Sequence, residues 1–225
     1  DTQRMVESEI MDNMEIRVGI VEDNGLLRYS LSNSLQAEGF DVIFALENGV
    51  QAIKELETSK IDVLVVDLNL GQQLNGVDVS LVWQKQVPKL GVVYLTSYED
   101  PRAVVGGKVP QLAKNSIYLL KDHLADGSEL ISAIRKVAHQ EGFSDYKLTS
   151  PLAKLTDRQF QVLRLLSEGA SNKEIAKHRG ITEASVAVAV NRISKVLGIP
   201  SQLDRNQRVH LARVFLNQTA RPDGD

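Results

Sequence analysis

Five polar residues of the chain follow short runs of branched apolar residues: Glu22 and Asp23 after one run, and Asp67, Thr96 and Lys121 each after another. Three carboxylates that lie close together repel one another, and each raises the pKa of the others unless a cation lies among them. Carboxylate oxygens suit Mg²⁺. An ammonium and a hydroxyl can bind phosphoryl oxygens, and a carboxylate can attack phosphorus to form an acyl phosphate. If the fold brings these residues together, they predict phosphoryl transfer to a carboxylate with the help of Mg²⁺.

The apolar runs predict the elements that position these residues. The run before Asp67, Val63–Val66, is apolar throughout, which is typical of a strand buried on both faces of a parallel sheet. Strands are expected at 16–21, 40–46, 61–66, 92–95 and 117–120, and helices at 24–39, 49–58, 77–86 and 127–140. This alternation predicts a doubly wound parallel α/β sheet, in which the carboxyl ends of the strands line one crevice. The alternative for Asp67 is that it only caps the following turn.

One stretch of the first part departs from this alternation. Residues 97–116 contain Pro101, Gly106, Gly107 and Pro110. A glycine costs a helix interior about 1 kcal/mol and a proline about 3 kcal/mol. We therefore expect any helix between the fourth and fifth strands to be short, displaced or broken.

The formal charge of −3 hides a strong asymmetry along the chain. Residues 1–146 carry a balance of −9, whereas residues 147–221 carry +8. An acidic first part and a basic second part predict two domains with different partners, the second a polyanion binder. We expect the domains at 15–141 and 155–218, with a polar linker over 142–154.

The second part has the pattern of a small all-α domain. Thr156 and Gln159 form a capping-box pair at the start of a helix that ends at Gly169. Further helices are expected at 171–179, 184–197 and 203–216. Two short helices joined by a tight turn on a basic domain favour a helix-turn-helix, whose second helix enters the major groove of DNA.

Composition excludes several classes of protein. The chain has 43% hydrophobic and 24% charged residues, which fits a globular protein, and it contains no cysteine, which excludes disulfides and thiolate metal sites. Because no apolar run reaches about 18 residues, we expect no membrane span and a cytoplasmic location. Residues 1–13 and 219–225 are expected to be poorly ordered.

Residues 16–141 resemble a response-regulator receiver domain. That family has an acidic pair after strand one, a phosphoacceptor aspartate after strand three, a hydroxyl after strand four and a lysine after strand five. The resemblance implies a flavodoxin-like five-stranded fold, Asp67 as phosphoacceptor, Thr96 and Lys121 as its partners, and a switch formed by Thr96 and Tyr118. It also implies that Mg²⁺ binds Glu22, Asp23, Asp67 and the backbone of Asn69. Gly71 stands where the family usually has proline, and the alternative for Tyr118 is ordinary strand packing.

The segment LTDRQFQVLRLLSEGASNKEIAKHRGIT, which starts at Leu155, resembles the LuxR-type helix-turn-helix of NarL/FixJ response regulators. Three positions depart from that family: Arg179 replaces a usual leucine, and Ala187 and Ala189 replace a usual lysine and histidine. The expected DNA contacts come from the start of the second helix and from the recognition helix, and are Lys173, Thr182, Ser185, Val188, Asn191, Arg192 and Lys195. The alternative is that the recognition helix packs against protein and that DNA binding is lost.

The two resemblances predict a two-component response regulator that a histidine kinase phosphorylates on Asp67 and that controls transcription by binding DNA. We expect a homodimer, with or without dependence on phosphorylation. The candidate dimer contact is the helix at 203–216, which is apolar at Val209, Ala212 and Phe215. The alternative is that this helix packs within its own domain. The alternative function is a signalling adaptor whose divergent helix-turn-helix binds protein. No enzyme activity is expected beyond loss of the chain's own acyl phosphate.

Overall fold

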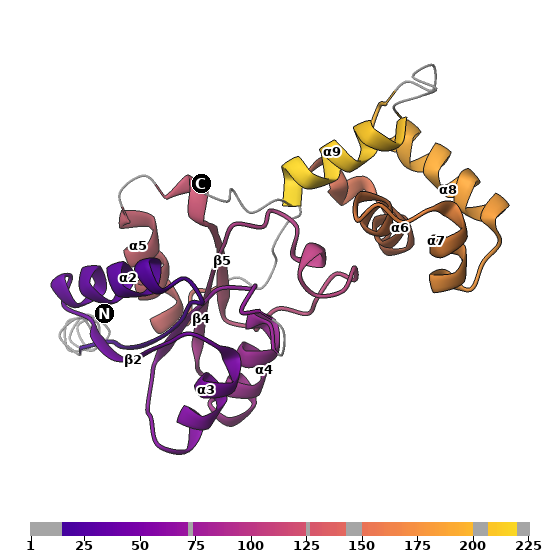
Figure 1. Ribbon diagram of the computed structural model, residues 1–225. Coiled ribbons are helices and arrows are strands. Elements are labelled where there is room, and N and C mark those ends of the chain that lie inside the picture. The colour runs from indigo at the N-terminus through magenta and orange to yellow at the C-terminus, as the bar shows by residue number, and fades with distance from the viewer. Residues whose placement is uncertain (1–14, 72–73, 125–126, 143–149, 200–206, 220–225) are drawn as a thin grey trace, which may run out of the picture. The chain divides into compact units, whose positions relative to one another are not determined.

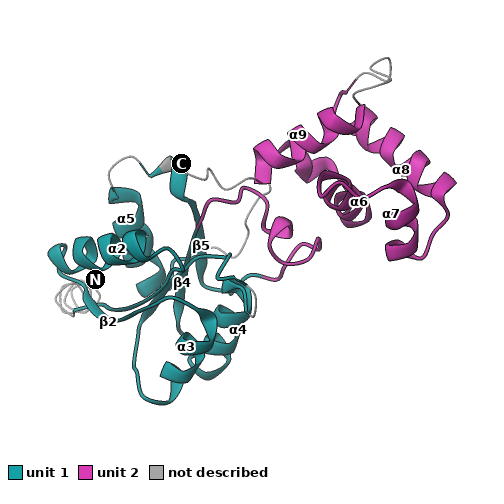
Figure 2. Ribbon diagram, viewed as in Figure 1, with its two compact units in different colours: residues 1–95, 112–146 teal, residues 96–111, 147–225 magenta. Residues whose placement is uncertain are grey.

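The computed structural model describes residues 15–71, 74–124, 127–142, 150–199 and 207–219. The chain divides into a first unit, residues 1–95 with 112–146, and a second unit, residues 96–111 with 147–225 (Figure 2). The largest difference from the expected domains is at residues 96–111, which group with the C-terminal part rather than with the sheet that they interrupt. Two sets of hydrogen bonds join this segment to the C-terminal part. Arg102 donates to the carbonyls of Leu152 and Leu155, and the Gln161 side-chain amide donates to the carbonyls of Gly106 and Gly107.

The first unit contains a five-stranded sheet in the order β2-β1-β3-β4-β5 (Figure 1). Its strands are β1 (Arg17–Val21), β2 (Asp41–Leu46), β3 (Val63–Val66), β4 (Gly91–Thr96) and β5 (Ser116–Leu120). Strand β1 pairs in parallel with β2 and β3, and β3 pairs in parallel with β4. All four residues of β3 are buried, as the unbroken apolar run predicts. The predicted α/β fold is confirmed.

Helices cover both faces of this sheet. They are α2 (Gly25–Ala37), α3 (Gly49–Lys54), α4 (Gly76–Gln86) and α5 (Ser128–Ala138). Leu35 of α2 and Ile134 of α5 share one core with alternate residues of β1, β3 and β4. On the other face the Trp83 indole of α4 packs against Phe44 and donates a hydrogen bond to the Ala52 carbonyl.

Within the described residues between β4 and β5, the regular structure is one 3-10 turn, Pro101–Ala103. The expectation of a broken helix is confirmed. Gly106 and Gly107 both have φ near +82°, a left-handed conformation that other residues rarely adopt and that ends helical backbone.

The second unit is helical, with α6 (Asp157–Ser167), α7 (Asn172–Arg179), α8 (Glu183–Val196) and α9 (Gln207–Thr219) around one core. Thr156 and Ser171 cap α6 and α7 through capping boxes, and Thr182 caps α8. Helix α7 ends at Gly180, which has φ +64°. This arrangement places α7 and α8 as a helix-turn-helix pair.

Two of the expected domain and tail boundaries differ in the structure. Pro151–Lys154, expected as linker, forms a 3-10 turn, because Leu152 is fully buried in the core of the second unit. Thr219, expected to be poorly ordered, ends α9 and donates its hydroxyl to the Phe215 carbonyl. Leu203, the expected start of that helix, and the tails 1–13 and 220–225 lie outside the described residues. The helices described are all too short or too polar to cross a bilayer.

Candidate functional site

Three carboxylates and one ammonium meet at the carboxyl edge of the sheet. Glu22, Asp23 and Asp67 each offer a carboxylate oxygen within 4.8 Å of the other two. Glu22 directly follows β1, Asp67 directly follows β3, and Lys121 directly follows β5. The Lys121 Nζ donates to Glu22 Oε2 at 2.7 Å and to Asp67 Oδ2 at 2.9 Å. The structure thus brings together four of the five polar residues that the sequence singled out.

The electrostatics of this cluster favour a bound cation. Glu22 and Asp67 are 1% and 4% exposed. Burial raises the pKa of Glu22, and the hydrogen bond from Lys121 opposes that rise. Three carboxyl groups lie beside one ammonium in a largely desolvated position, so a further positive charge there would offset the repulsion between the carboxylates. Oxygen donors with net negative charge are the set that Mg²⁺ takes, so the residues fit the ion that the sequence predicts.

Asp67 serves the local turn as well as the cluster. Its Oδ1 accepts a hydrogen bond from the Asn69 amide at 3.2 Å, in addition to the contact of its Oδ2 with Lys121, and its role as phosphoacceptor stays a prediction. Gly76, at the start of α4, allows the close approach behind it, because a Cβ there would lie 2.2 Å from the Asp67 carbonyl oxygen. Sequence reasoning missed Gly76, which is recognisable only once the start of α4 is known to contact the backbone of Asp67.

Thr96 is the last residue of β4 and is fully buried. Its hydroxyl oxygen accepts a hydrogen bond from the Tyr98 amide at 3.3 Å. Tyr118 is half-buried in β5, with its ring 6.2 Å from that of Tyr94. The Tyr94 hydroxyl shares a hydrogen bond with Ser80 and accepts one from the Ala113 amide. Tyr118 therefore packs as a strand aromatic in this structure, and its switch role stays a prediction.

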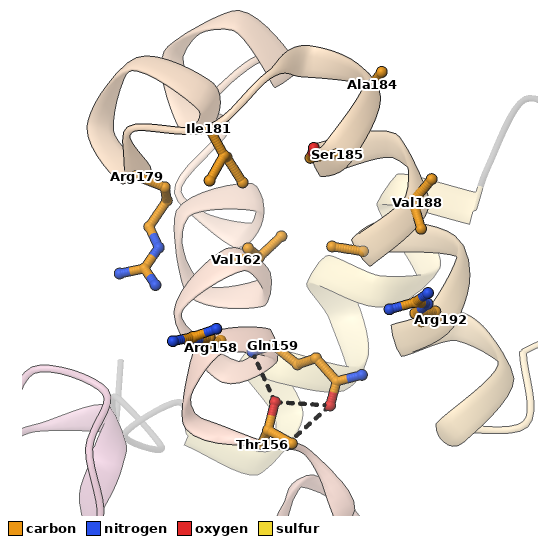
Figure 3. A pocket seen from close by; sticks show the side chains of 11 residues that line it. Thr156, Arg158, Gln159, Val162, Arg179, Ile181, Ala184, Ser185, Val188 and Arg192 are labelled. Carbon is orange, nitrogen blue, oxygen red and sulfur yellow. Dashed lines mark hydrogen bonds between the residues drawn. The ribbon is translucent and has the colours of Figure 1, made fainter.

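The second unit carries a groove of about 890 Å³ between the start of α6, the end of α7 and the exposed side of α8 (Figure 3). Arginines from these three helices, Arg158, Arg179 and Arg192, line it. No acidic side chain is among the described residues that form its wall. Val188, half exposed, and Ser185 add apolar and hydroxyl surface from α8. Cationic, hydroxyl and methyl groups on one surface suit a nucleic acid, whose phosphates and thymine methyl groups they can bind.

The expected DNA contacts divide into three groups. Ser185, Val188 and Arg192 line the groove. Thr182 caps α8 instead, its hydroxyl oxygen accepting the Ser185 amide at 3.1 Å. Exposed side chains outside the groove wall are those of Lys173, Asn191 and Lys195. Sequence reasoning missed Arg158 and Arg179 as groove residues, although the unusual arginine at 179 was a signal for one of them.

The candidate dimer face on α9 is corrected in part. Phe215 is 6% exposed, and its ring packs edge-on against Phe160 at 5.4 Å. Ala212 also packs on the domain core. Both residues therefore serve their own domain, because the apolar stripe of α9 is buried by α6. Val209 and Leu216, at 54% and 47% exposed, lie on the outer side.

Comparison with known proteins agrees with this architecture. Residues 18–135 match the response regulator receiver domain family, and residues 153–212 match the luxR family of bacterial regulatory proteins. The chain is 29% identical over 227 residues to the DNA-binding transcriptional activator DevR/DosR of Mycobacterium tuberculosis, covering 93% of this chain and 99% of that protein. It is 26% identical over 213 residues to the transcriptional regulatory protein LnrK of Bacillus subtilis, covering 85% and 94%.

A solved structure shares the fold. The response regulator RcsB in complex with DNA superposes with a TM-score of 0.57 at 20% identity, over 91% of this chain and 99% of that one. The acidic cluster with its lysine, the parallel sheet that forms it and the helix-turn-helix that follows all agree with the two matched families. The chain belongs to the response regulators, with an N-terminal receiver domain and a C-terminal regulatory domain of the luxR family.

Proposed function

We propose that Asp67 accepts a phosphoryl group from a histidine kinase and that the second unit binds DNA in response. The observation that carries the first half is the Lys121 ammonium, which bridges Glu22 and Asp67 within a buried acidic cluster. A purely structural ion pair needs one carboxylate for one ammonium. The excess of buried negative charge has a use if the site binds a cation and a phosphoryl group together.

The transfer itself requires positioning and neutralisation of charge. One Asp67 carboxylate oxygen forms a bond to phosphorus while the bond between phosphorus and the imidazole nitrogen of the kinase breaks, and that nitrogen keeps the electron pair. Phosphorylation removes the negative charge of the Asp67 carboxylate, so Lys121 loses one partner and can pair with a phosphoryl oxygen instead. The Thr96 hydroxyl is the second donor that we assign to that group.

Glu22, Asp23, Asp67 and the Asn69 carbonyl would hold Mg²⁺, which when bound neutralises charge on the phosphoryl oxygens. The assignment predicts that Asp23→Ala weakens Mg²⁺ binding, which isothermal calorimetry measures without any phosphoryl donor. Asp122→Asn, an exposed carboxylate next to Lys121, is the matched control and should bind as wild type does. Equal affinity of Asp23→Ala and wild type would remove the acidic pair from the site.

The groove is our proposed DNA contact. Its three arginines can each hold a phosphate, while Val188 offers methyl groups to a thymine. The positive balance of residues 147–221 adds long-range attraction. A gel-shift assay across a salt series tests this with DNA retained from a random pool. Arg192→Ala should weaken binding and flatten its salt dependence, whereas Arg213→Ala, exposed on α9, should leave both nearly unchanged.

The alternative is a receiver-based adaptor whose second unit binds protein. It is favoured by Ala187 and Ala189, which stand where the resembled helix-turn-helix family usually has lysine and histidine, and by the exposed Val188. The same gel-shift series separates the two. Retention of no DNA at low salt, by phosphorylated and unphosphorylated protein alike, would favour the adaptor.

We further propose that the chain is a cytoplasmic homodimer when it acts, since paired helix-turn-helix domains fit two DNA half-sites. Val209 and Leu216 are the exposed apolar residues of α9 that such a contact would use. Sedimentation with and without beryllofluoride measures the mass. A monomer under both conditions, with DNA present, contradicts the dimer.

A further inference from the structure

The segment that follows Thr96 is built into the second unit. Residues 96–111 connect β4 to β5, yet they group with the C-terminal helices (Figure 2). The group at the centre of this arrangement is Arg102, which is 1% exposed, and its partner Asp100, which is fully buried. A buried guanidinium in a loop has to find partners for all its donors, because an unpaired buried charge is costly.

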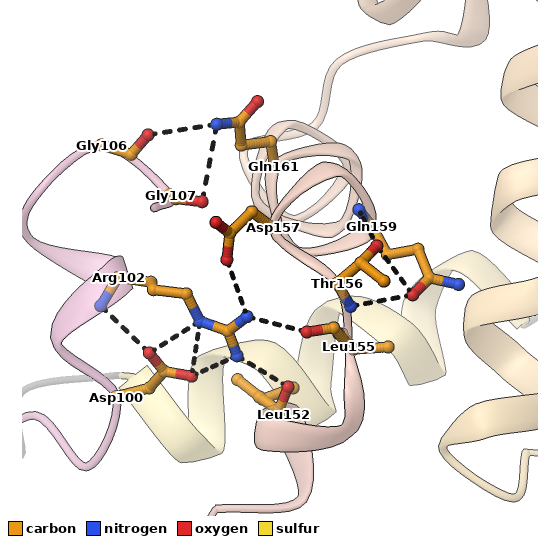
Figure 4. Close-up of polar contacts among 10 residues, drawn as sticks. All are labelled: Asp100, Arg102, Gly106, Gly107, Leu152, Leu155, Thr156, Asp157, Gln159 and Gln161. Atoms are coloured by element: carbon orange, nitrogen blue, oxygen red, sulfur yellow. Dashed lines mark hydrogen bonds and ion pairs between the residues drawn. The ribbon is translucent and has the colours of Figure 1, made fainter. Parts of the chain in front are cut away.

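Arg102 finds these partners in two segments of the second unit (Figure 4). Its Nε and Nη2 donate to the two carboxylate oxygens of Asp100, with Nη2 to Oδ2 at 2.7 Å. Nη2 also donates to the Leu152 carbonyl and Nη1 to the Leu155 carbonyl, both at 2.8 Å. Nη1 lies 3.4 Å from an Asp157 carboxylate oxygen. These contacts occupy the five donors of the guanidinium, and its carbon lies 4.4 Å above the centre of the Phe160 ring.

A second contact ties the same segment to α6. The Gln161 side-chain amide lies 3.5 Å from the carbonyl oxygens of Gly106 and Gly107. A Cβ at Gly107 would lie 2.5 Å from Gln161 Cγ, so glycine is needed at this approach. The Gln161 side-chain oxygen, Oε1, also accepts a hydrogen bond from Arg179, one of the groove arginines.

These contacts fall on residues that are adjacent in sequence to one wall of the groove. Leu152 and Leu155, which bind Arg102, precede α6, and Asp157 is its first residue. The neighbouring residues Thr156 and Arg158 line the groove. The groove geometry at α6 therefore depends on a segment that is covalently continuous with the end of β4. Thr96, the hydroxyl assigned to the phosphoryl group, stands six positions before Arg102.

We propose that Arg102 is a positioning residue of the DNA-binding unit, and that the segment 97–111 carries the phosphorylation state of the receiver directly to the start of α6. The proposal rests on the functions proposed for Asp67 and for the groove. A movement of Thr96 toward a phosphoryl group displaces the chain that follows it. Because the Arg102 guanidinium is fixed to two backbone carbonyls at the start of α6, that displacement reaches the groove wall through rigid contacts rather than through a loose tether.

Hydrogen exchange of the full-length protein, measured by mass spectrometry with and without Mg²⁺ and beryllofluoride, tests this route. The wild type should change its exchange in residues 97–104 and 152–161 together. In Arg102→Met/Asp100→Leu, which removes both charges and keeps similar volume, the change in 152–161 should be lost while that in 97–104 remains. The matched control removes the exposed pair of the first unit, Arg17→Met/Asp62→Leu, and should respond as wild type does.

The outcomes separate the proposal from its premises. If residues 152–161 of the double variant change their hydrogen exchange as much as those of the wild type, the proposal is overturned. It is also overturned if the wild type forms the Asp67 adduct with acetyl phosphate and the hydrogen exchange of residues 152–161 does not change. Failure to form that adduct is a failure of the proposed function instead. Arg102→Lys is the second variant if the double one does not fold. It keeps a positive charge beside Asp100 but cannot hold both carbonyls in a fork, so it should also lose the response, and a full response from it overturns the proposal.

Discussion

Replacement of Arg102 by alanine should destabilise the second unit far more than loss of a surface ion pair would. The variant leaves the Asp100 carboxylate, which is fully buried, without its cation, and it removes the donors to the carbonyls of Leu152 and Leu155. Removal of one partner of a buried ion pair costs about 3–5 kcal/mol. That is a large share of the roughly 5–15 kcal/mol that holds an ordinary domain folded.

The assay follows from the positions of the chromophores. Trp83 is the single tryptophan of the chain and lies buried in the first unit, so its fluorescence reports that unit. Far-UV circular dichroism reports the helices of both units. In urea, Arg102→Ala should shift the dichroism transition to lower denaturant and leave the fluorescence midpoint nearly unchanged.

The control is the ion pair between Arg17 and Asp62, in which both side chains are about two-fifths exposed. Arg17→Ala should cost about 0–1 kcal/mol, and the change should appear in the fluorescence transition. A cost for Arg102→Ala within about 0.5 kcal/mol, the range of an ordinary surface substitution, would contradict the role given to the buried pair.

Three further outcomes are expected. The hydrogen bond from Arg17 holds the pKa of Asp62 below its usual range, so the stability that the ionised Asp62 contributes is present above its unfolded pKa and is lost as the pH falls through its folded pKa. In urea unfolding followed from pH 7 downward, Asp62→Asn should therefore be less stable than wild type at neutral pH and equally stable in acid. A difference in stability that stays constant with pH would refute this. Gly76→Ala should cost about 1–3 kcal/mol and slow phosphorylation, because its Cβ would meet the Asp67 carbonyl, and a wild-type rate by phosphate-affinity gel would count against that contact. Arg179→Leu should lower DNA affinity and reduce the salt slope by about one phosphate contact, so an unchanged slope in the gel-shift series would remove Arg179 from the interface.

Sequence patterns predicted the receiver site because each of its parts is local. An apolar run such as Val63–Val66 identifies a buried strand by itself, and a polar residue at its end is visible without knowledge of the fold. The rule that parallel strands end at one edge then brings Glu22, Asp67 and Lys121 together. Once these three residues lie at one edge of the sheet, the Lys121 ammonium is close enough to bind both carboxylates, so no further sequence pattern was needed to predict that contact.

The remaining features depend on contacts between distant segments. Pro101 and the two glycines at 106 and 107 predicted a broken helix. Nothing in the sequence shows that Arg102 binds backbone carbonyls, because every residue has a backbone carbonyl and none is marked as the partner. For the same reason the grouping of residues 96–111 with the C-terminal helices was not foreseeable. Phe215 was ambiguous because an apolar stripe on α9 has the same pattern whether it packs on its own domain or on a partner.

The most direct test of the central claim is chemical identification of the phosphorylated residue. The full-length protein is treated with acetyl phosphate and Mg²⁺, reduced with borohydride, which converts an aspartyl phosphate to homoserine, and mapped by mass spectrometry. We predict homoserine at position 67 in the wild type and in Asp122→Asn, and none anywhere in Asp67→Asn. Equal conversion in Asp67→Asn, or modification of Glu22 or Asp23 in the wild type, would contradict the assignment of Asp67 as phosphoacceptor.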